Sequence, residues 1–201
     1  MSDHKKHHLL RTTVTAIAIL GVGSLVIAYV AGAGVPRAFF AARLQAAGAA
    51  NNLAVLTNNS LANLKRIELL ETGGSSDQAL ELLSFEISQK QDKQNAAVVL
   101  ASNLEEMAKA GMEITSSSAR GLAIEAVTAG VSMVSRIVSY NNSLDQLFSA
   151  IQAKIQSGAV PPGVNIRTLL AGINSDGKAI NDLNNAFNAT LEEFDKNYGT
   201  N

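Results

Sequence analysis

The chain has 201 residues, of which 4% are aromatic, and it contains no tryptophan and no cysteine. This length is typical of one domain with a short appendage, and the scarcity of aromatics leaves Leu, Ile, Val and Ala to form a core, as in many helical proteins. Residues 36–201 carry 13 basic and 16 acidic side chains, so their net charge is −3; they show no basic stripe of the kind that binds nucleic acid, and disulfide bonds are excluded.

Residues 1–11 form a short polar segment that contains all three histidines, His4, His7 and His8. These histidines, beside two lysines, have the composition for weak contacts with a metal ion or with anionic lipid headgroups. So few residues cannot build a core of their own. We therefore expect a solvated cytoplasmic tail.

Residues 12–36 contain no charged side chain. A helix of about 20 apolar residues crosses the hydrocarbon core of a bilayer, and the apolar region of a cleaved signal peptide is usually only about 7 to 15 residues long. We therefore expect residues 12–35 to form a transmembrane signal-anchor helix in contact with membrane lipid. Two alternatives stay open, a cleaved signal with Ala31–Ala33 as its processing site and a buried helix of a soluble protein.

Basic residues on the two sides of this predicted span indicate its orientation. Lys5, Lys6 and Arg11 precede it, whereas only Arg37 and Arg43 follow closely. Cytoplasmic flanks are enriched in Lys and Arg, so the N-terminus should be cytoplasmic. The protein is accordingly expected in the inner or plasma membrane, with residues 36–201 in the periplasm or outside the cell.

Three small residues, Ser24, Ala28 and Gly32, share one face of the predicted span. Small residues four positions apart allow two membrane helices to approach closely. The spacing therefore favours packing against another helix in the membrane, although apolar helices rich in Ala and Gly also show it by chance.

The remainder, residues 36–201, has helical periodicity almost throughout. Glycines and serines at 72–76 and prolines within 157–165 predict two breaks. Whether residues 76–157 form one helix or two is left open, because three serines at 116–118 lower helix propensity without forbidding a helix. We expect an all-α fold, in which the N-terminal transmembrane helix precedes an elongated antiparallel, coiled-coil-like bundle of about four long helices.

Apolar side chains form a stripe in each segment, and those of the third stripe advance by steps of three and four residues, which is the repeat of one helix face. The first stripe is Leu53, Leu56, Leu64, Ile67 and Leu70, and the second is Leu80, Leu83, Ile87, Val98, Leu104 and Met107. The third is Leu122, Ala126, Ala129, Met133, Ile137, Tyr140, Leu144, Leu147, Ile151 and Ile155. We predict that these faces form the core.

The last segment has a strict heptad repeat. Its positions are Ile173, Gly177, Ile180, Asn184, Phe187, Leu191, Phe194 and Tyr198. A buried Asn in such a seam typically fixes the register of the helices at some cost in stability, so Asn184 is our candidate register residue. The alternative is that Asn184 faces water beside the seam.

Glu125 and Arg136 interrupt the most apolar stretch of the bundle segment. They stand about three helical turns apart on one face, so they could form a polar interface with a partner or simply lie exposed at an edge. Residues 9–201 contain neither His nor Cys, so no metal site or cofactor is expected. The same lack argues against catalysis by Ser-His or Cys-His groups, and we expect no enzyme.

These features predict a single-pass membrane-anchored scaffold or adaptor that binds or spaces partner proteins at the cell envelope. Other envelope proteins and a second copy of the chain, joined through the span and the heptad seams, are the expected partners. The alternative is a sensory or ligand-binding extracytoplasmic domain that signals through a separate partner. Such a domain needs a cavity with convergent polar groups, and the region of Glu125 and Arg136 is its candidate.

Overall fold

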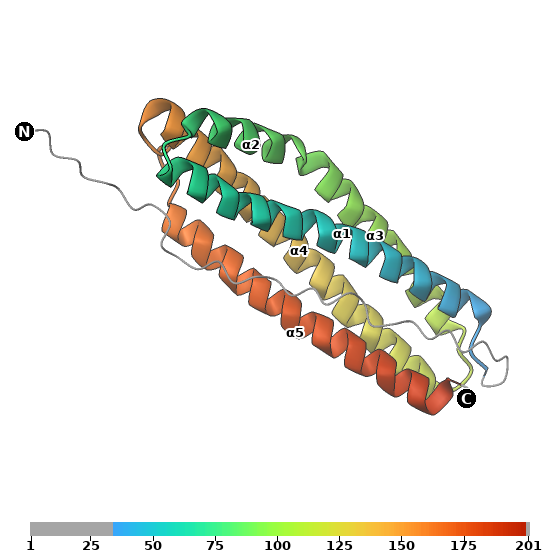
Figure 1. Ribbon diagram of the computed structural model, residues 1–201. Coiled ribbons are helices and arrows are strands. Elements are labelled where there is room, and N and C mark those ends of the chain that lie inside the picture. The colour runs from blue at the N-terminus through green and yellow to red at the C-terminus, as the bar shows by residue number, and fades with distance from the viewer. Residues whose placement is uncertain (1–33, 200–201) are drawn as a thin grey trace, which may run out of the picture.

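The computed structural model describes residues 34–199, of which 88% are helical and none lies in a strand. The helices in this part of the chain are α1 (Arg37–Thr72), α2 (Ser76–Ser88), α3 (Lys90–Met112), α4 (Ser117–Ser157) and α5 (Ile166–Tyr198). Figure 1 shows α2 and α3 as one bent arm, so the described bundle has four arms that run alternately in opposite directions. The all-helical, bundle-like architecture is as predicted.

The bend between α2 and α3 lies at Gln89, and it leaves the helical hydrogen bonding in place. The amide of Gln89 donates to the carbonyl of Phe85 at 3.2 Å, and the amide of Lys93 donates to that of Gln89 at 3.1 Å. A true reversal follows only after α3, where Ser116 caps α4 by accepting a hydrogen bond from the amide of Ala119. Residues 76–157 thus form three helices, two of them nearly continuous.

The predicted break at 157–165 is confirmed. Gly158 ends α4 in the left-handed conformation, with φ of 76°, which favours glycine. Its amide donates to the carbonyl of Lys154. The side chain of Asn165 then caps α5 by accepting a hydrogen bond from the amide of Thr168.

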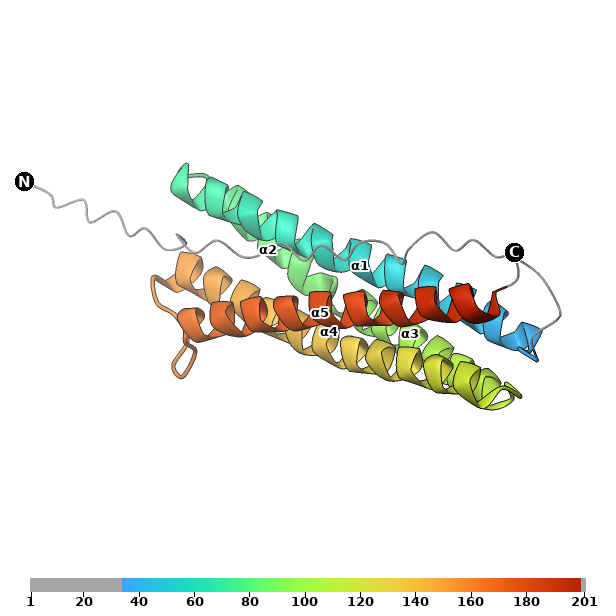
Figure 2. The ribbon, with the colours of Figure 1, turned by 90° about the horizontal axis from the view of Figure 1, so that it is seen from below.

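One end of the bundle, which we call the base, holds the first described residues together with the end of α5 (Figures 1 and 2). The amide of Thr115, in the α3–α4 turn, donates to the carbonyl of Gly34 at 3.1 Å. Arg43 of α1 donates two hydrogen bonds to Asp195 of α5, at 2.6 and 2.8 Å. The opposite end, the tip, holds the α1–α2 turn and the α4–α5 loop.

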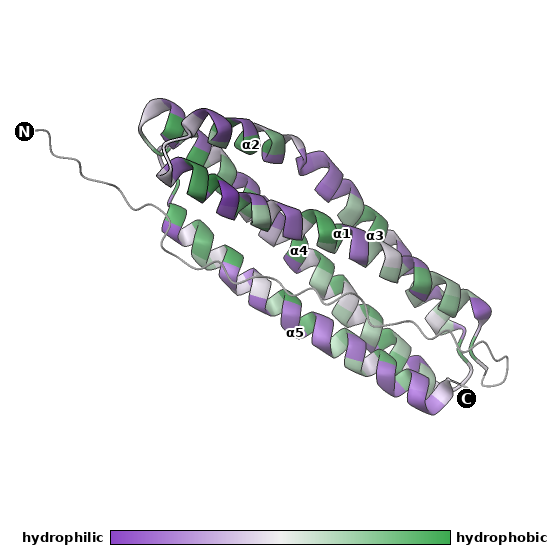
Figure 3. Ribbon diagram, in the orientation of Figure 1, coloured by the Kyte–Doolittle hydropathy of each residue, from purple (hydrophilic) through white to green (hydrophobic). Residues whose placement is uncertain are grey.

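Most residues of the predicted stripes form the core, and Figure 3 shows apolar and polar residues alternating along the helices. The third stripe and the heptad positions of the last segment are buried or half-buried throughout. The second stripe is wrong at Val98, which is 67% exposed, because Leu100 and not Val98 continues the inward face of α3. Leu100 stands four residues before Leu104 and seven before Met107, so the helical repeat itself favours Leu100 over Val98.

The predicted span at residues 12–35 lies outside the described residues, apart from its last two positions. Within residues 34–199 one helix is long and apolar enough to cross a membrane, and it is α4, not a helix at the N-terminus. This position was not predicted, because Glu125 and Arg136 interrupt α4. Its apolar composition has a physical reason in the bundle, since α4 packs against α2, α3 and α5.

Gly130 lies where three helices meet closely. A Cβ atom on Gly130 of α4 would come within 2.8 Å of Leu104 Cδ2 on α3 and 3.4 Å of Phe187 Cε2 on α5. Gly121, on the same helix, has no atom within 4 Å of such a Cβ. The close approach of α3, α4 and α5 therefore depends on the missing side chain of Gly130.

Gly130→Ala should lower the free energy of unfolding by about 1–2 kcal/mol, because the methyl group must displace Leu104 from a packed core. Gly121→Ala is the matched control, and it should raise stability by about 0.5–1 kcal/mol through helix propensity alone. Urea unfolding followed by circular dichroism measures both. Equal effects of the two substitutions would contradict the close packing at Gly130.

Candidate functional site

A cluster of buried polar side chains lies on both sides of the bend at Gln89. Glu86 of α2 and Lys93 of α3 are each only 2% exposed. They are seven residues apart, which is about two helical turns, so both point into the bundle. We call these two residues, with Ser60, Asn63 and Asp145, the polar network.

Glu86 is held by α1. The hydroxyl of Ser60 donates to Glu86 Oε2 at 2.6 Å, and Asn63 Nδ2 donates to Oε1 at 2.5 Å. Both carboxylate oxygens therefore have a donor. These bonds compensate part of the cost of removing the carboxylate from water.

Lys93 is held mainly by α4. Its Nζ donates to Asp145 Oδ1 at 2.8 Å and approaches the hydroxyl of Ser60 at 3.5 Å. The same Nζ lies 5.8 Å from the centre of the Phe148 ring, a distance at which the ring still attracts a cation. Lys93 thereby links the carboxylate of α4 to the group that binds Glu86.

Three further polar side chains lie beside the network. Thr57 of α1 and Asn141 of α4 share a buried hydrogen bond at 3.4 Å. The hydroxyl of Tyr140 is buried and has no hydrogen-bond partner among the described residues. Burial raises the pKa of Tyr140, because an ionised phenol would be poorly solvated there.

The geometry of the polar network suits a structural role better than a catalytic one. A lysine that attacks a substrate must lose its proton and reach the substrate, whereas Lys93 is ion-paired and almost fully buried. The ion pair of Lys93 with Asp145 and the hydrogen bonds of Glu86 to α1 can form together only in one register, so the network fixes how the arms align. In residues 34–199, no three His, Cys, Asp or Glu side chains gather to hold a metal ion.

The site residues predicted from sequence do not come together. Ser24, Ala28 and Gly32 lie outside the described residues. Glu125 is exposed on α4, while Arg136, eleven positions later, donates to Asp176 of α5 at 3.2 Å.

Asn184 is 2% exposed and its Oδ1 has no partner among the described residues. It therefore lies in the seam and not beside it. Its role in fixing the register stays a prediction.

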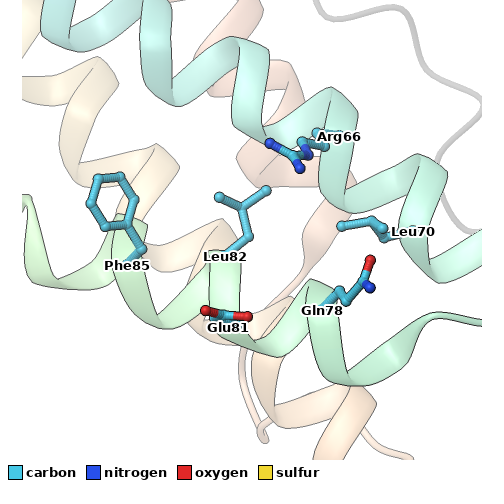
Figure 4. A pocket seen from close by; sticks show the side chains of 6 residues that line it. All are labelled: Arg66, Leu70, Gln78, Glu81, Leu82 and Phe85. Carbon is cyan, nitrogen blue, oxygen red and sulfur yellow. The ribbon is translucent and has the colours of Figure 1, made fainter.

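A surface cleft of about 430 Å³ lies between α1 and α2 near the tip. Its lining residues, shown in Figure 4, are Arg66, Leu70, Gln78, Glu81, Leu82 and Phe85. None of them belongs to the polar network. In the figure the guanidinium of Arg66 extends from α1 toward Leu82 of α2.

Sequence reasoning missed the polar network, although a signal existed. Leu100 and Met107 are buried on α3, and counting back from them in steps of seven reaches Lys93 and then Glu86. The polar composition of residues 88–95 hides this signal when the stretch is considered by itself. Extending the heptad backward would have placed both charges on the buried face.

No protein-family model matches the chain, and no curated protein or solved structure matches it either.

Lys93→Met should lower the free energy of unfolding by about 3–5 kcal/mol, because it leaves Asp145 buried without its cation. The double variant Lys93→Met with Asp145→Leu should recover most of that loss, since an apolar pair of similar volume replaces the ion pair. Urea unfolding at neutral pH measures each variant.

Lys109→Met on the same helix is the matched control. Lys109 pairs with Glu105 and Glu106, but all three side chains are more than half exposed, so stability should hardly change. A double variant as unstable as Lys93→Met would contradict the importance of the pair.

Tyr140→Phe should keep or raise stability at a pH of about 7, by up to about 1–3 kcal/mol, because it removes a buried hydroxyl without a partner. The raised pKa gives the sign at alkaline pH. In the unfolded chain Tyr140 ionises above a pH of about 10, whereas in the folded chain it stays neutral, so stability falls as the pH rises.

The substitution should therefore make the decrease in stability between pH of about 9 and 11 shallower. Thermal unfolding across that range measures the effect, with Tyr198→Phe at a half-buried position as the control. An unchanged alkaline slope in Tyr140→Phe would argue against a buried neutral phenol.

Proposed function

We propose that the chain is a single-pass membrane-anchored helical scaffold that binds or spaces partner proteins at the cell envelope. Residues 1–11 lie in the cytoplasm, residues 12–35 form the anchor, and residues 36–201 stand in the periplasm or outside the cell. No enzymatic activity is part of the proposal.

The short distance between the predicted span and the bundle carries this proposal. The span is expected to end at residue 35, and α1 begins at Arg37, after Pro36 as its capping residue. The base is fixed at that point by the bond between Gly34 and Thr115. An anchor that ends there would join the base of the bundle without a flexible linker.

The length of the bundle supports a spacing role. The 36 residues of α1 correspond to about 54 Å at 1.5 Å per residue. With the base at the membrane, the tip would stand about that far from the bilayer. Contacts made near the tip would then be held at a defined distance from the membrane surface.

The described surface offers apolar side chains for contacts, while the buried charged side chains are bound within the bundle. The large apolar residues that are exposed are Leu44, Val55, Leu69, Phe85, Val98, Val99, Met112, Val131, Val138 and Val164. They are distributed over several helices. Such side chains favour protein contacts when they gather in patches.

The sensory alternative has no comparable support. Its candidate region contains Glu125, which is exposed, and Arg136, which pairs with Asp176. The cleft between α1 and α2 includes neither of them. The scaffold is therefore the function that the described geometry supports best.

Introducing two charges into the predicted anchor tests the proposal. Val22→Arg with Val26→Arg should release the full chain from carbonate-washed membranes, because each arginine at the centre of a span costs about 2.5–3.5 kcal/mol. The matched control is Val131→Arg with Val138→Arg on α4, where both valines are at least 38% exposed. The control protein should stay in the membrane.

Release by the α4 pair alone would place the span in α4 and overturn the predicted topology. Recovery of a chain that begins at Gly34 in the medium would show that the anchor is cleaved. Affinity purification of the intact chain from native membranes tests the scaffold role itself. Without any co-purifying protein or second copy, that role would be refuted.

A further inference from the structure

Apolar and polar side chains line the cleft between α1 and α2 in equal number. The apolar ones are Leu70, Leu82 and Phe85, and Phe85 is 52% exposed. A phenylalanine exposed to this extent beside two leucines is suited to burial against another surface.

Two opposite charges flank these apolar side chains. Arg66 comes from α1 and Glu81 from α2, and both are exposed. Neither takes part in an ion pair or side-chain hydrogen bond within residues 34–199. The cleft therefore presents one unpaired cation and one unpaired anion.

The two charges lie at the same distance from the base. Ser60 and Asn63 of α1 both bind Glu86, which fixes the level of α2 against α1. From that level, Arg66 lies a few residues farther along α1, toward the tip. Glu81 precedes Glu86 by five residues, and because α2 runs in the opposite direction, it also lies toward the tip. At 1.5 Å per residue, their levels agree to within about 5 Å.

We propose that this cleft is the contact between two copies of the chain. Around a two-fold axis parallel to the helices, every residue of the second copy stays at its own distance from the base. Arg66 of one copy then meets Glu81 of the other twice, and the two copies of Phe85, one helical turn nearer the base, pack against each other next to these ion pairs. Such a surface is complementary to itself, as a two-fold contact requires.

The parallel arrangement rests on the proposed function, since two copies anchored in one membrane stand with both bases on the same side. A different protein partner would place no condition on the relative levels of Arg66 and Glu81. A second copy requires their levels to agree, and they do. This agreement is the reason for preferring a second copy as the occupant.

Site-specific crosslinking in intact membranes tests the contact. The chain contains no cysteine, so Gln78→Cys in the cleft introduces a single thiol and leaves the apolar residues unchanged. A flexible bismaleimide should give a crosslinked dimer. Val98→Cys, at a position that is 67% exposed on α3, is the control and should give none.

Charge exchange then tests the pairing in the Gln78→Cys background. Arg66→Glu alone and Glu81→Arg alone should each reduce the dimer by at least about fivefold, because like charges meet at both contacts. The double variant should restore it. Co-expression of the two single variants should also restore it, since each then meets the opposite charge.

Lys65→Glu is the matched control for charge reversal, because Lys65 is exposed beside Arg66 but does not line the cleft. It should leave the yield of dimer unchanged. Melting temperatures of all variants separate loss of contact from loss of folding.

Several results would overturn the inference: monomer only at Gln78→Cys, a dimer unaffected by Arg66→Glu, or a crosslink to a different protein. The fraction of chain in the membrane is measured in the same samples. A membrane-bound monomer refutes the dimer and leaves the proposed anchor standing. A crosslinked dimer in the soluble fraction refutes the anchor and leaves the contact between two copies standing.

Discussion

Burial of a charged lysine in an aliphatic core constrains the described bundle more than any other contact. Lys93 must find an anion inside, and Asp145 of α4 provides it at 2.8 Å. The hydroxyl of Ser60 connects this pair to Glu86, so three of the four arms meet at one level. Aliphatic faces tolerate sliding by a turn, whereas these bonds do not, so the network selects one alignment.

The same network explains the bent arm. Glu86 and Lys93 lie on either side of Gln89, and each binds a different neighbour, one on α1 and the other on α4. A bend allows one continuous arm to satisfy both without losing its own helical hydrogen bonds. The hydrogen bonds of Glu86 to α1 also fix how far α2 lies along α1. As a result, Arg66 and Glu81 stand at similar distances from the base.

Periodicity predicted most of the fold, because burial of one helix face is a local property. The heptad of α5 is buried from Ile173 to Phe194, and both breaks near 73 and 158 were foreseen. The network was not foreseen, since the burial of Lys93 depends on Asp145, 52 residues later. The partner of Arg136 and the cleft likewise depend on contacts between helices, which a single sequence does not specify.

The chain has two apolar segments, and they differ in how apolarity is distributed. In α4 five charged residues interrupt the apolar composition, namely Arg120, Glu125, Arg136, Asp145 and Lys154, and the core contacts are on its inner face. Residues 12–36 contain no charged residue at all. A helix packed in a bundle needs only one apolar face, whereas lipid surrounds a span on every side. This contrast favours the N-terminal segment as the proposed anchor and α4 as a core helix of the bundle.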